Sequence, residues 1–492
     1  METLLTSKQM HEVDVYTIQH QPISSIDLME RAAQEFVKVF KKKYPNKKKS
    51  ISILCGQGNN GGDGLAISRI LYNDKYENIS VYLILFGTKQ SNEYIENLER
   101  LAKTKIRPIQ ITEPEQFKNI KSDLIIDAIL GSGLNKPFTD KFAELAHNVN
   151  VLNKTTIAVD VPTGFPSEGL IDKDYKGIKA DLVICFQRPK LNFFFPESKV
   201  ALAQFEVVNI GLDEDFIVSI PSNWKLITKP ALNPRANFTH KGTYGHALIV
   251  AGNTTTMGAA LLSARACLRV GAGLTTLCLP NSGLVALNTT LPEVMALPRN
   301  EHLAVEALEE YTAIAIGPGL GLAEEDELLF NKVINLRKPL VVDADALNML
   351  AKRMDLYEKL PERTVLTPHL KEFDRLFGVH QTWWERIQTA KKQAKQRNLI
   401  IILKNQYTFV CLPNEEVHIN QTGNPGMASG GMGDVLTGMI VGFLAQGYSS
   451  ADAAKLAVYA HGKAGDELAR KRFTVSALQV AEQLPKTLKR II

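Results

Sequence analysis

The segment between Gly423 and Gly447, GNPGMASGGMGDVLTGMIVGFLAQG, joins a glycine-rich stretch to one carboxylate and an apolar run. After Asp434 the apolar residues recur at i, i+1, i+4 and i+5, which predicts a buried helix that begins near Gly433 and stops at Gly447. The first turn of a helix has unpaired backbone N–H groups and a positive dipole end, and glycines let an anion approach them. We therefore predict a phosphate-handling loop with Asp434 as the nearby acid or base. An aspartate that only caps the helix is the alternative interpretation.

The first half of the chain holds a second glycine-rich segment, CGQGNNGGDG at 55–64, between an apolar run and the helical pattern LAISRILY. Its position resembles that of a dinucleotide-binding loop, but its details do not match that fingerprint. Asn59, Asn60 and Asp63 stand among its glycines, so amides and a carboxylate join the bare backbone. This composition predicts a ligand-binding crevice.

Two further carboxylates, Asp127 and Asp160, end neighbouring predicted strands. Each alone is explained equally well as a structural aspartate that caps the following loop. Together with Asn60 and Thr163 they offer oxygen ligands in one place, which suits a hard monovalent or divalent cation better than a transition metal.

The second half adds a histidine, a lysine and a glycine-rich turn. His369 ends the run VLTPH, and a strand-end histidine that bonds a loop explains it equally well. A buried Lys404 would favour an anion, although KNQYTFVCL alternates like one arm of a surface hairpin. The turn IGPGLG at 316–321 permits close backbone approach or is simply a turn. The chain has no G-x-x-x-x-G-K-[ST] motif, and HGKAG at 461–465 is not one, so the loop before Asp434 is the candidate phosphate site.

The elements that must position these residues alternate between apolar runs and helical patterns in the first half of the chain. Such runs predict a parallel sheet that is covered on both faces and binds ligands beyond the carboxyl ends of its strands. The predicted strands are SISILC (50–55), VYLILF (81–86), DLIIDAIL (123–130), TTIAVDVP (155–162) and ADLVICF (180–186).

Apolar runs again alternate with helical patterns in the second half of the chain. The two halves are separated by a stretch at about 209–238 with three prolines and no clear period, which predicts a crossover between domains. We therefore expect two α/β domains, one over residues 1–215 and one over residues 225–492. The predicted strands of the second are HALIVAG (246–252), LTTLCLP (274–280), AIAIGPG (313–319), PLVVDADAL (339–347), VLTPH (365–369) and LIIILKN (399–405).

Length and composition agree with this division. A chain of 492 residues with 45% hydrophobic and 22% charged residues is typical of a globular protein with more than one core. The small net charge of +5 argues against a nucleic-acid partner. Five cysteines without a C-x-x-C pair predict buried thiols in a reducing compartment, and no segment reaches the length of a membrane span. We expect a cytoplasmic enzyme that does not bind membranes.

The motifs of the first half resemble a known family. KQMHEVD, LMERAA, CGQGNNGGDGLA, DAILGSGLNKP and AVDVPTG are similar to the YjeF N-terminal domain, the NAD(P)HX epimerase, whose fold is Rossmann-like. In the second half GNTTTMGAALLSARACLRVGAGL, IGPGLG, DADALN, LTPHLKEFDRL, LKN and GNPGMASGGMGDVLTG resemble the ribokinase-like, ADP-dependent NAD(P)HX dehydratase. Order and fusion resemble the bifunctional NAD(P)H-hydrate repair enzymes, which implies two three-layer α/β/α domains.

The resemblance implies an activity and its substrates. These are NADHX and NADPHX, the forms of NADH and NADPH hydrated at C6 of the nicotinamide ring. The first domain would interconvert their R and S epimers, and the second would dehydrate the S epimer with ADP, leaving AMP and phosphate. The implied cofactors are potassium for the epimerase and magnesium as a companion of ADP, and we also expect a homo-oligomer. The choice of ADP over ATP rests on the resemblance alone.

Carried over residue by residue, the epimerase motifs place the hydrate on three segments and the potassium ion on three oxygen ligands. Asp160 is our candidate for proton transfer. The hydrate residues are Asn59, Asn60, Gly61, Gly62, Asp63, Gly131, Ser132, Gly133, Leu134, Asn135, Lys136, Pro137 and Asp160, and the potassium ligands are Asn60, Asp127 and Thr163.

In the dehydratase the resemblance implies that Asp434 contacts the hydrate and acts in catalysis. The other hydrate contacts are Ala259, Gly319 and His369, and the nucleotide residues are Lys404, Asn405, Gln406, Tyr407, Thr408 and Gly433. Two alternatives stay open. The second domain could be a small-molecule kinase that releases a stable phosphate ester, and the first could be a binding module without catalysis.

Overall fold

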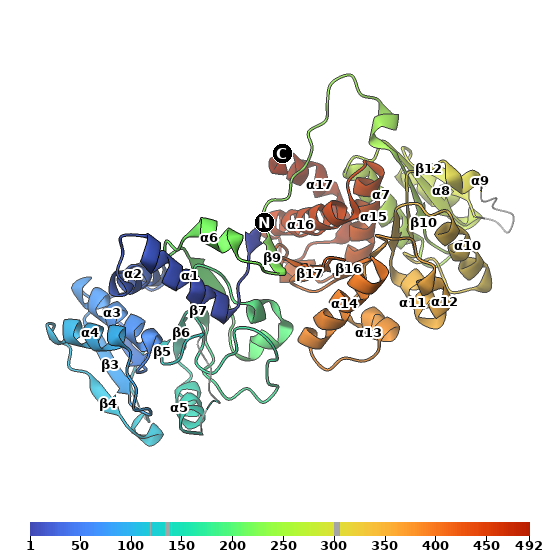
Figure 1. Cartoon of the computed structure of the whole chain (residues 1–492). Helices are drawn as coiled ribbons and strands as arrows, with labels where there is room; N and C mark the ends of the chain where they lie inside the picture. Colours follow the sequence, from blue (N-terminus) through green and yellow to red (C-terminus); the bar gives the residue numbers. More distant parts are fainter. Residues whose placement is uncertain (119, 133–137, 139, 300–305) are drawn as a thin grey trace. The chain divides into compact units, whose positions relative to one another are not determined.

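The computed structural model describes residues 1–118, 120–132, 138, 140–299 and 306–492 (Figure 1). The chain divides into two compact units. The N-terminal unit comprises Thr3–Ser222, and the C-terminal unit comprises Asn223–Ile492 together with Met1–Glu2.

The sheet of the N-terminal unit is parallel throughout its described strands, in the order β4-β3-β2-β5-β6-β7-β8. Successive strands run outward in both directions from the β2–β5 pair, so the loops after β2 and β5 flank the point where the order reverses, the usual ligand crevice of such sheets. The strands are β2 Ser50–Cys55, β3 Asn78–Ile84, β4 Ile109–Ile111, β5 Leu124–Ala128, β6 Thr155–Val159, β7 Leu182–Phe186 and β8 Phe205–Val208.

Helices cover both faces of this sheet. Alternate strand residues point to opposite faces, so Ile51 and Ile53 of β2 join one apolar core with α2 and α3, whereas Leu54 joins a second core with α5. The unit therefore has three layers. Its helices are α1 Ser7–His20, α2 Ser25–Lys43, α3 Asn59–Asn73, α4 Asn92–Ala102, α5 Asp140–Val151 and α6 Glu214–Ser219.

Helix α3 begins six residues earlier than the predicted helical pattern LAISRILY, because its first turns contain the glycines that the sequence assigns to a loop. Side chains would not fit there: a Cβ atom on Gly61 would lie 1.7 Å from the carbonyl oxygen of Gly56, and one on Gly64 would lie 2.6 Å from Cβ of Ala128. Close packing on the sheet outweighs the low helix propensity of glycine.

The C-terminal unit is built on an eleven-stranded sheet, in the order β1-β9-β18-β17-β16-β15-β14-β13-β10-β11-β12 among the described strands. The run from β16 to β12 is parallel, and β17 pairs antiparallel with both β16 and β18. The hairpin pattern of KNQYTFVCL is thus present as β17. The strands are β1 Glu2–Thr3, β9 Trp224–Ile227, β10 His246–Val250, β11 Leu274–Leu279, β12 Met295–Pro298, β13 Ala313–Ile316, β14 Leu340–Val342, β15 Val365–Leu366, β16 Ile400–Leu403, β17 Thr408–Cys411 and β18 Val417–Asn420.

Helix α15 is the centre of the larger core in this unit. Every residue from Val435 to Ala445 is buried, and α7, α16 and α17 pack around it (Figure 1). Leu248 and Ile314, which face away from this core, are also fully buried, so the sheet is covered on both sides. The helices are α7 Met257–Arg269, α8 Leu284–Thr290, α9 Glu306–Glu309, α10 Glu324–Asn335, α11 Ala344–Lys352, α12 Met354–Glu358, α13 Leu370–Phe377, α14 Trp383–Arg397, α15 Met432–Ala445, α16 Ser450–Ala469 and α17 Ala477–Ile491.

Two further stretches differ from the sequence prediction. The segment at 209–238 contains α6 and β9 in addition to irregular chain. The strand predicted over PLVVDADAL ends at Val342, and α11 starts at Ala344. Asp343 therefore ends a strand and precedes a helix. None of the described helices combines the length and apolar character needed to cross a membrane.

Candidate active sites

A cavity of about 650 Å³ lies at the carboxyl ends of the strands of the C-terminal unit. It is bounded by the residues after β14, β16 and β18, by the start of α15 and by α16. The lining residues that bear on the site are Asp343, His369, Glu372, Lys404, Asn405, Gln406, Thr408, Gly431, Gly433, Asp434 and His461. Seven predicted site residues thus meet in one cavity, and Tyr407 is not part of this lining.

The glycine-rich loop opens α15 onto this cavity. Gly431 is the N-cap residue with a φ of 89°, a left-handed conformation that favours glycine, and no side chain caps the helix. A Cβ atom on Gly430 would touch nothing within 4 Å, and one on Gly433 would lie 3.3 Å from Nζ of Lys404. The first N–H groups of α15 therefore have an open approach next to a cation, as an anion site requires.

Asp434 does not cap α15, because the N-cap position belongs to Gly431. The backbone carbonyl of Asp434 accepts a hydrogen bond of 2.9 Å from Ser263 Oγ on α7, which holds the start of the helix in place. The pKa of Asp434 is raised to about 7, mainly by burial and next by the charge of Asp343, although Lys404 lowers it. A carboxyl group with such a pKa can take up and release a proton near neutral pH.

Lys404 is held by a buried carboxylate. Its Nζ lies 2.9 Å from Oδ1 of Asp343, and Thr437 on α15 donates a hydrogen bond of 2.7 Å to Oδ2 of the same residue. Burial would lower the pKa of the Lys404 ammonium, but the charges of Asp343, Glu372 and Asp434 outweigh it and the net pKa is raised. Lys404 therefore keeps its positive charge beside the glycine loop.

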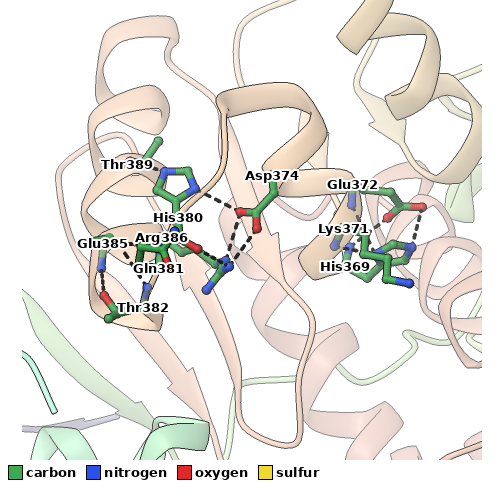
Figure 2. A network of polar contacts seen from close by, with 10 residues as sticks. All are labelled: His369, Lys371, Glu372, Asp374, His380, Gln381, Thr382, Glu385, Arg386 and Thr389. Atoms are coloured by element: carbon green, nitrogen blue, oxygen red, sulfur yellow. Dashed lines mark hydrogen bonds and ion pairs between the residues drawn. The ribbon is translucent and has the colours of Figure 1, made fainter. Parts of the chain in front are cut away.

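The start of α13 supplies two more polar residues to the cavity (Figure 2). His369 caps this helix, since its Nδ1 accepts from the backbone N–H groups of Lys371 and Glu372. The carboxylate of Glu372 accepts from the backbone of His369 at 2.8 Å and lies 3.4 Å from its Nε2. His369 thus caps α13 and also lines the cavity, and its contact with the hydrate stays a prediction.

Figure 2 also shows the cluster that fixes the other end of α13. Asp374 contacts His380 at 3.0 Å and receives two hydrogen bonds from Arg386, and His380 Nε2 contacts Thr389 Oγ1 at 2.8 Å. The Asp–His–Thr order is that of a catalytic triad, but Arg386 already occupies both oxygens of the aspartate. This cluster fastens α13 to α14 and so positions His369 and Glu372.

Ala259 and Gly319, the other two predicted hydrate contacts, lie next to each other outside the cavity lining. Thr256 joins them: its carbonyl oxygen accepts from the backbone N–H of Ala259, and its hydroxyl donates to the carbonyl oxygen of Gly319 at 2.7 Å. Ser263 links Ala259 to Asp434, because its hydroxyl contacts the backbone oxygens of both residues. Ala259 thus shares Ser263 with the backbone of Asp434, and Thr256 connects Ala259 to Gly319.

In the N-terminal unit the three predicted potassium ligands surround the turn after β5. Thr163 donates from its hydroxyl to Oδ1 of Asp127 at 2.7 Å and from its backbone to Oδ2 at 2.8 Å. The same hydroxyl accepts from the backbone of Leu130 at 3.0 Å, and the side chain of Asn60 lies against Gly131. Burial raises the pKa of Asp127 to about 6 although hydrogen bonds from Thr163 lower it.

Asp160 lies beyond the end of β6 with a φ of 63°, a strained conformation for a residue with a side chain. Its Oδ1 is 2.8 Å from Nζ of Lys190 and accepts from the backbone of Phe186 at 3.1 Å. Burial would lower the pKa of Lys190, but Asp160, Cys185 and Asp14 reverse this and raise it. Strand ends β6 and β7 thus hold a buried ion pair.

Two more carboxyl groups belong to this cluster. The pKa of Asp14 is raised to about 6, mainly by burial, while the charge of Lys190 lowers it and that of Asp160 raises it. Burial also raises the pKa of Asp63 well above its usual value, with further increases from Asp160 and Asp14. Lys190 was not predicted from the sequence, although it follows β7 as Asp160 follows β6, so the rule that ligands bind at strand ends would have found it.

The remaining predicted hydrate residues are only partly described. Gly131 and Ser132 are present at the end of the β5 turn, whereas Gly133, Leu134, Asn135, Lys136 and Pro137 lie outside the described residues. Asn59, Asn60, Gly61, Gly62 and Asp63 form the first turns of α3. Nδ2 of Asn60 is buried and has no hydrogen-bond partner in the described part of the chain.

The two units define a class of protein, in which a Rossmann-like unit is joined to a ribokinase-like unit with an acid beside an open, glycine-rich helix start. Residues 25–192 match the family described as YjeF-related protein N-terminus, and residues 247–486 match the family described as NAD(P)H-hydrate dehydratase. A ribokinase-like superfamily protein of Enterococcus faecalis aligns with a TM-score of 0.50 and 28% identity over 55% of this chain and 98% of its own. The predicted α/β fold class is confirmed.

Relatives named bifunctional NAD(P)H-hydrate repair enzyme match both units. The one from Moorella thermoacetica is 33% identical over 95% of this chain and 93% of its own length. The one from Escherichia coli is 34% identical over 95% of this chain and 89% of its own length. The chain belongs to the family of bifunctional NAD(P)H-hydrate repair enzymes, as its motifs predict.

Proposed function

We propose that this chain repairs hydrated NADH and NADPH in two steps. The N-terminal unit, taken as residues 1–215, interconverts R and S NAD(P)HX, and the C-terminal unit, taken as residues 225–492, dehydrates the S epimer with ADP. The products are NAD(P)H, AMP and phosphate. Family membership supports both activities, and the observation that carries the second is Asp434, a carboxyl group with a pKa of about 7 beside an open helix start.

The dehydration is a phosphoryl transfer followed by an elimination. Hydroxide is a poor leaving group, whereas phosphate is a good one. Asp434 takes the proton of the C6 hydroxyl, the oxygen attacks the terminal phosphorus of ADP, and AMP leaves. Phosphate then leaves C6 with the bonding electrons, a proton leaves the adjacent ring carbon, and the double bond of NAD(P)H is restored.

The charges around the cavity suit this transfer. Lys404 and the open N–H groups at Gly433 would hold the phosphates, and Asn405 to Thr408 would hold the rest of the nucleotide. Ala259, Gly319 and His369 would hold the hydrate on the side of Asp434. Magnesium would accompany the phosphates, since the carboxylates of Asp343 and Glu372 in the same cavity are oxygen ligands of the kind that it binds.

For the epimerase we propose that Asp160 moves the proton and that Lys190 positions its carboxylate. The 2.8 Å contact between them fixes Oδ1, and the strained backbone of Asp160 supports a functional constraint. The hydrate would lie on Asn59 to Asp63 and on Gly131 to Pro137, at the point where the strand order reverses.

We propose potassium on Asn60, Asp127 and Thr163. One carboxylate with amide and hydroxyl oxygens suits a cation of low charge, and the hydroxyl oxygen of Thr163 lies 2.7 Å from Oδ1 of Asp127 while the side chain of Asn60 lies against the same turn. Bound potassium would supply positive charge and orient the turn after β5. Asp127→Ala should weaken hydrate binding about tenfold or more, because a charged ligand is lost. Exchange of R and S that is unchanged in this variant, and unchanged when a bulky organic cation replaces potassium, would disprove the site.

One assay tests both activities on the full chain. Mixed R and S hydrate with ADP should regain the absorbance of reduced nicotinamide completely, with one phosphate per turnover. A kinase would instead accumulate a stable phosphate ester. An N-terminal unit that only binds would leave the R epimer behind, apart from slow spontaneous exchange. Parallel reactions with ADP and ATP decide the nucleotide.

We also propose a reducing, cytoplasmic location and a homo-oligomer. All five cysteines are free and buried, which supports a reducing compartment. Light scattering after size-exclusion chromatography measures the oligomeric state directly.

A further inference from the structure

The motif HGKAGD at 461–466 has no part in the mechanism above, yet it forms one wall of the cavity. It lies on α16, and His461 and Gly462 line the cavity together with Val458. The two glycines allow close contact with the loop after β18. A Cβ atom on Gly462 would lie 2.4 Å from Oγ1 of Thr422, and one on Gly465 would lie 2.0 Å from the sulfur of Met427.

The last residue of the motif fastens the same loop. Oδ2 of Asp466 accepts from the backbone of Gly423 at 3.1 Å, and Oδ1 accepts from Nδ2 of Asn424 at 3.0 Å. Asn424 in turn accepts from the backbone of Gly426 at 3.0 Å. The loop and α16 thus form one fixed wall, in which the position of His461 is defined.

His461 brings an unused polar atom to this wall. Its Nε2 is buried and has no hydrogen-bond partner among the residues that the structure describes. The pKa of the imidazole is lowered to about 4, mainly by burial, while a bond to the backbone of Met432 raises it and the charge of Lys404 lowers it. A bond that raises the pKa is one in which the ring donates, and Nε2 has no partner among the described residues, so we assign the ring proton to Nδ1, which leaves Nε2 with a lone pair.

The chemistry of that atom limits what it can bind. A neutral acceptor does not suit the ionised phosphates of ADP, which carry no donor and are placed on Lys404 and Gly433. The donors on ADP are the exocyclic amine of adenine and the ribose hydroxyls. A buried acceptor left without a donor costs free energy, so a bound ligand that supplies one is favoured.

We propose that Nε2 of His461 accepts a hydrogen bond from the nucleoside part of ADP and so selects the nucleotide. This proposal rests on the proposed dehydratase function. The donor is either the adenine amine or a ribose hydroxyl, and nucleotide analogues distinguish the two. IDP lacks the amine, whereas 2′-deoxy-ADP and 3′-deoxy-ADP each lack one hydroxyl.

The test measures KM and kcat for ADP and the three analogues with S-NADHX, on the full chain and its variants. The wild type should lose about tenfold or more in kcat/KM with the analogue that lacks the donor, as sites built for a hydrogen bond do. His461→Phe should raise the KM for ADP by a similar factor, change kcat little, and no longer distinguish that analogue from ADP. His461→Gln, which keeps an acceptor, should retain part of the discrimination.

His418→Phe is the matched control. His418 is a buried histidine of β18 in the same unit, has an unpartnered Nδ1 and a lowered pKa caused by burial, and lies outside the cavity lining. This variant should keep the ratios among the four nucleotides. Equal use of all four nucleotides by the wild type, or a His461→Phe variant with unchanged ratios, overturns the proposal. A wild type that turns over no nucleotide overturns the dehydratase function itself.

Discussion

The two units use glycine-rich helix starts for opposite purposes. In α3 the glycines permit packing: Gly61 lies against the backbone of Gly56, and Gly64 lies against Ala128 and Cys55. At α15 they permit access, because a Cβ atom on Gly430 would meet nothing within 4 Å and one on Gly433 would approach only polar groups. The same sequence signature therefore marks a close helix–sheet contact in one unit and an open helix start in the other.

The two carboxylates proposed for proton transfer, one in each unit, also differ in their surroundings. Asp160 has its charge matched by Lys190 at 2.8 Å, whereas Asp434 has a pKa raised to about 7 by burial and by Asp343. A group with a raised pKa exchanges its proton near neutral pH. The proton transfer proposed at Asp434 should therefore depend on pH, whereas the one proposed at Asp160 should depend on its contact with Lys190.

The largest effect is expected for Asp434→Asn. Asparagine has nearly the same shape, and Asp434 does not cap α15, so the fold and ADP binding should remain. Dehydration should fall by about 10²–10⁴-fold if the residue is a general base. The measurement is single-turnover recovery of NADH absorbance, with a thermal melt beside it. A variant that melts much earlier and turns over normally at low temperature would show that Asp434 is structural.

Asp160→Asn should stop R/S exchange while dehydration of the S epimer continues. Asparagine tolerates the positive φ of this position, so the backbone should be kept, and loss of about 10²-fold or more is expected for a proton-transfer residue. Chromatography of the two epimers measures the rate. The double variant Asp160→Asn, Lys190→Met removes the unpaired lysine charge and separates loss of stability from loss of chemistry. Full exchange in either variant excludes Asp160.

Matched glycine variants test the packing-versus-access comparison directly. Gly61→Ala should destabilise the N-terminal unit by about 3 kcal/mol or more, because its Cβ would meet backbone at 1.7 Å. Gly433→Ala should change stability little but weaken ADP binding, since its Cβ would lie 3.3 Å from Lys404 Nζ. Denaturant unfolding and ADP titration measure the two effects. The reverse pattern would mean that the roles of the two loops are exchanged.

The smallest effect concerns pH. A base with a pKa of about 7 must be ionised to act, so the dehydration rate should rise with pH through about 7 and the rise should be absent in Asp434→Asn. The pKa of Asp434 is higher in the folded state than its usual 3.8, so ionisation disfavours folding. The free energy of unfolding of the C-terminal unit should therefore fall as pH rises from about 4 to about 7, less so in the variant. Equal pH slopes in both proteins would contradict the raised pKa.

The sequence predicts the central parallel strands of both sheets well, because buried parallel strands are continuous apolar runs with strong local signals. The prediction is wrong where tertiary packing determines the start of a helix. Glycines disfavour helix, yet α3 begins among them because the close contacts there leave no room for side chains. Short elements such as α6 and β9 carry too few residues for a periodic signal.

The site residues also divide into those that have a local signal in the sequence and those that do not. Asp434 and Lys404 stand at the ends of recognisable elements, so their cavity could be predicted. Lys190 pairs with a carboxylate that lies far from it in the sequence, whereas Glu372 belongs to a capping box at the start of α13, a local signal that the sequence prediction does not include. The motif of His461 does not match a phosphate loop, so no sequence signal places it in the cavity. Side chains that interact in the fold but lie far apart in the sequence produce no short motif that could be recognised.

The late position of α15 in the chain has a consequence for synthesis on the ribosome. The last strand of the N-terminal sheet ends at Val208, so that sheet can be completed early. The C-terminal unit can fold only after most of the chain has been synthesised, because its central helix spans Met432–Ala445. In addition, β9 at Trp224–Ile227 pairs with β18 at Val417–Asn420. Contacts of such long range slow folding and leave apolar surface exposed for longer. We therefore expect nascent chains stalled before α15 to hold a folded first unit and a second unit that depends on chaperones.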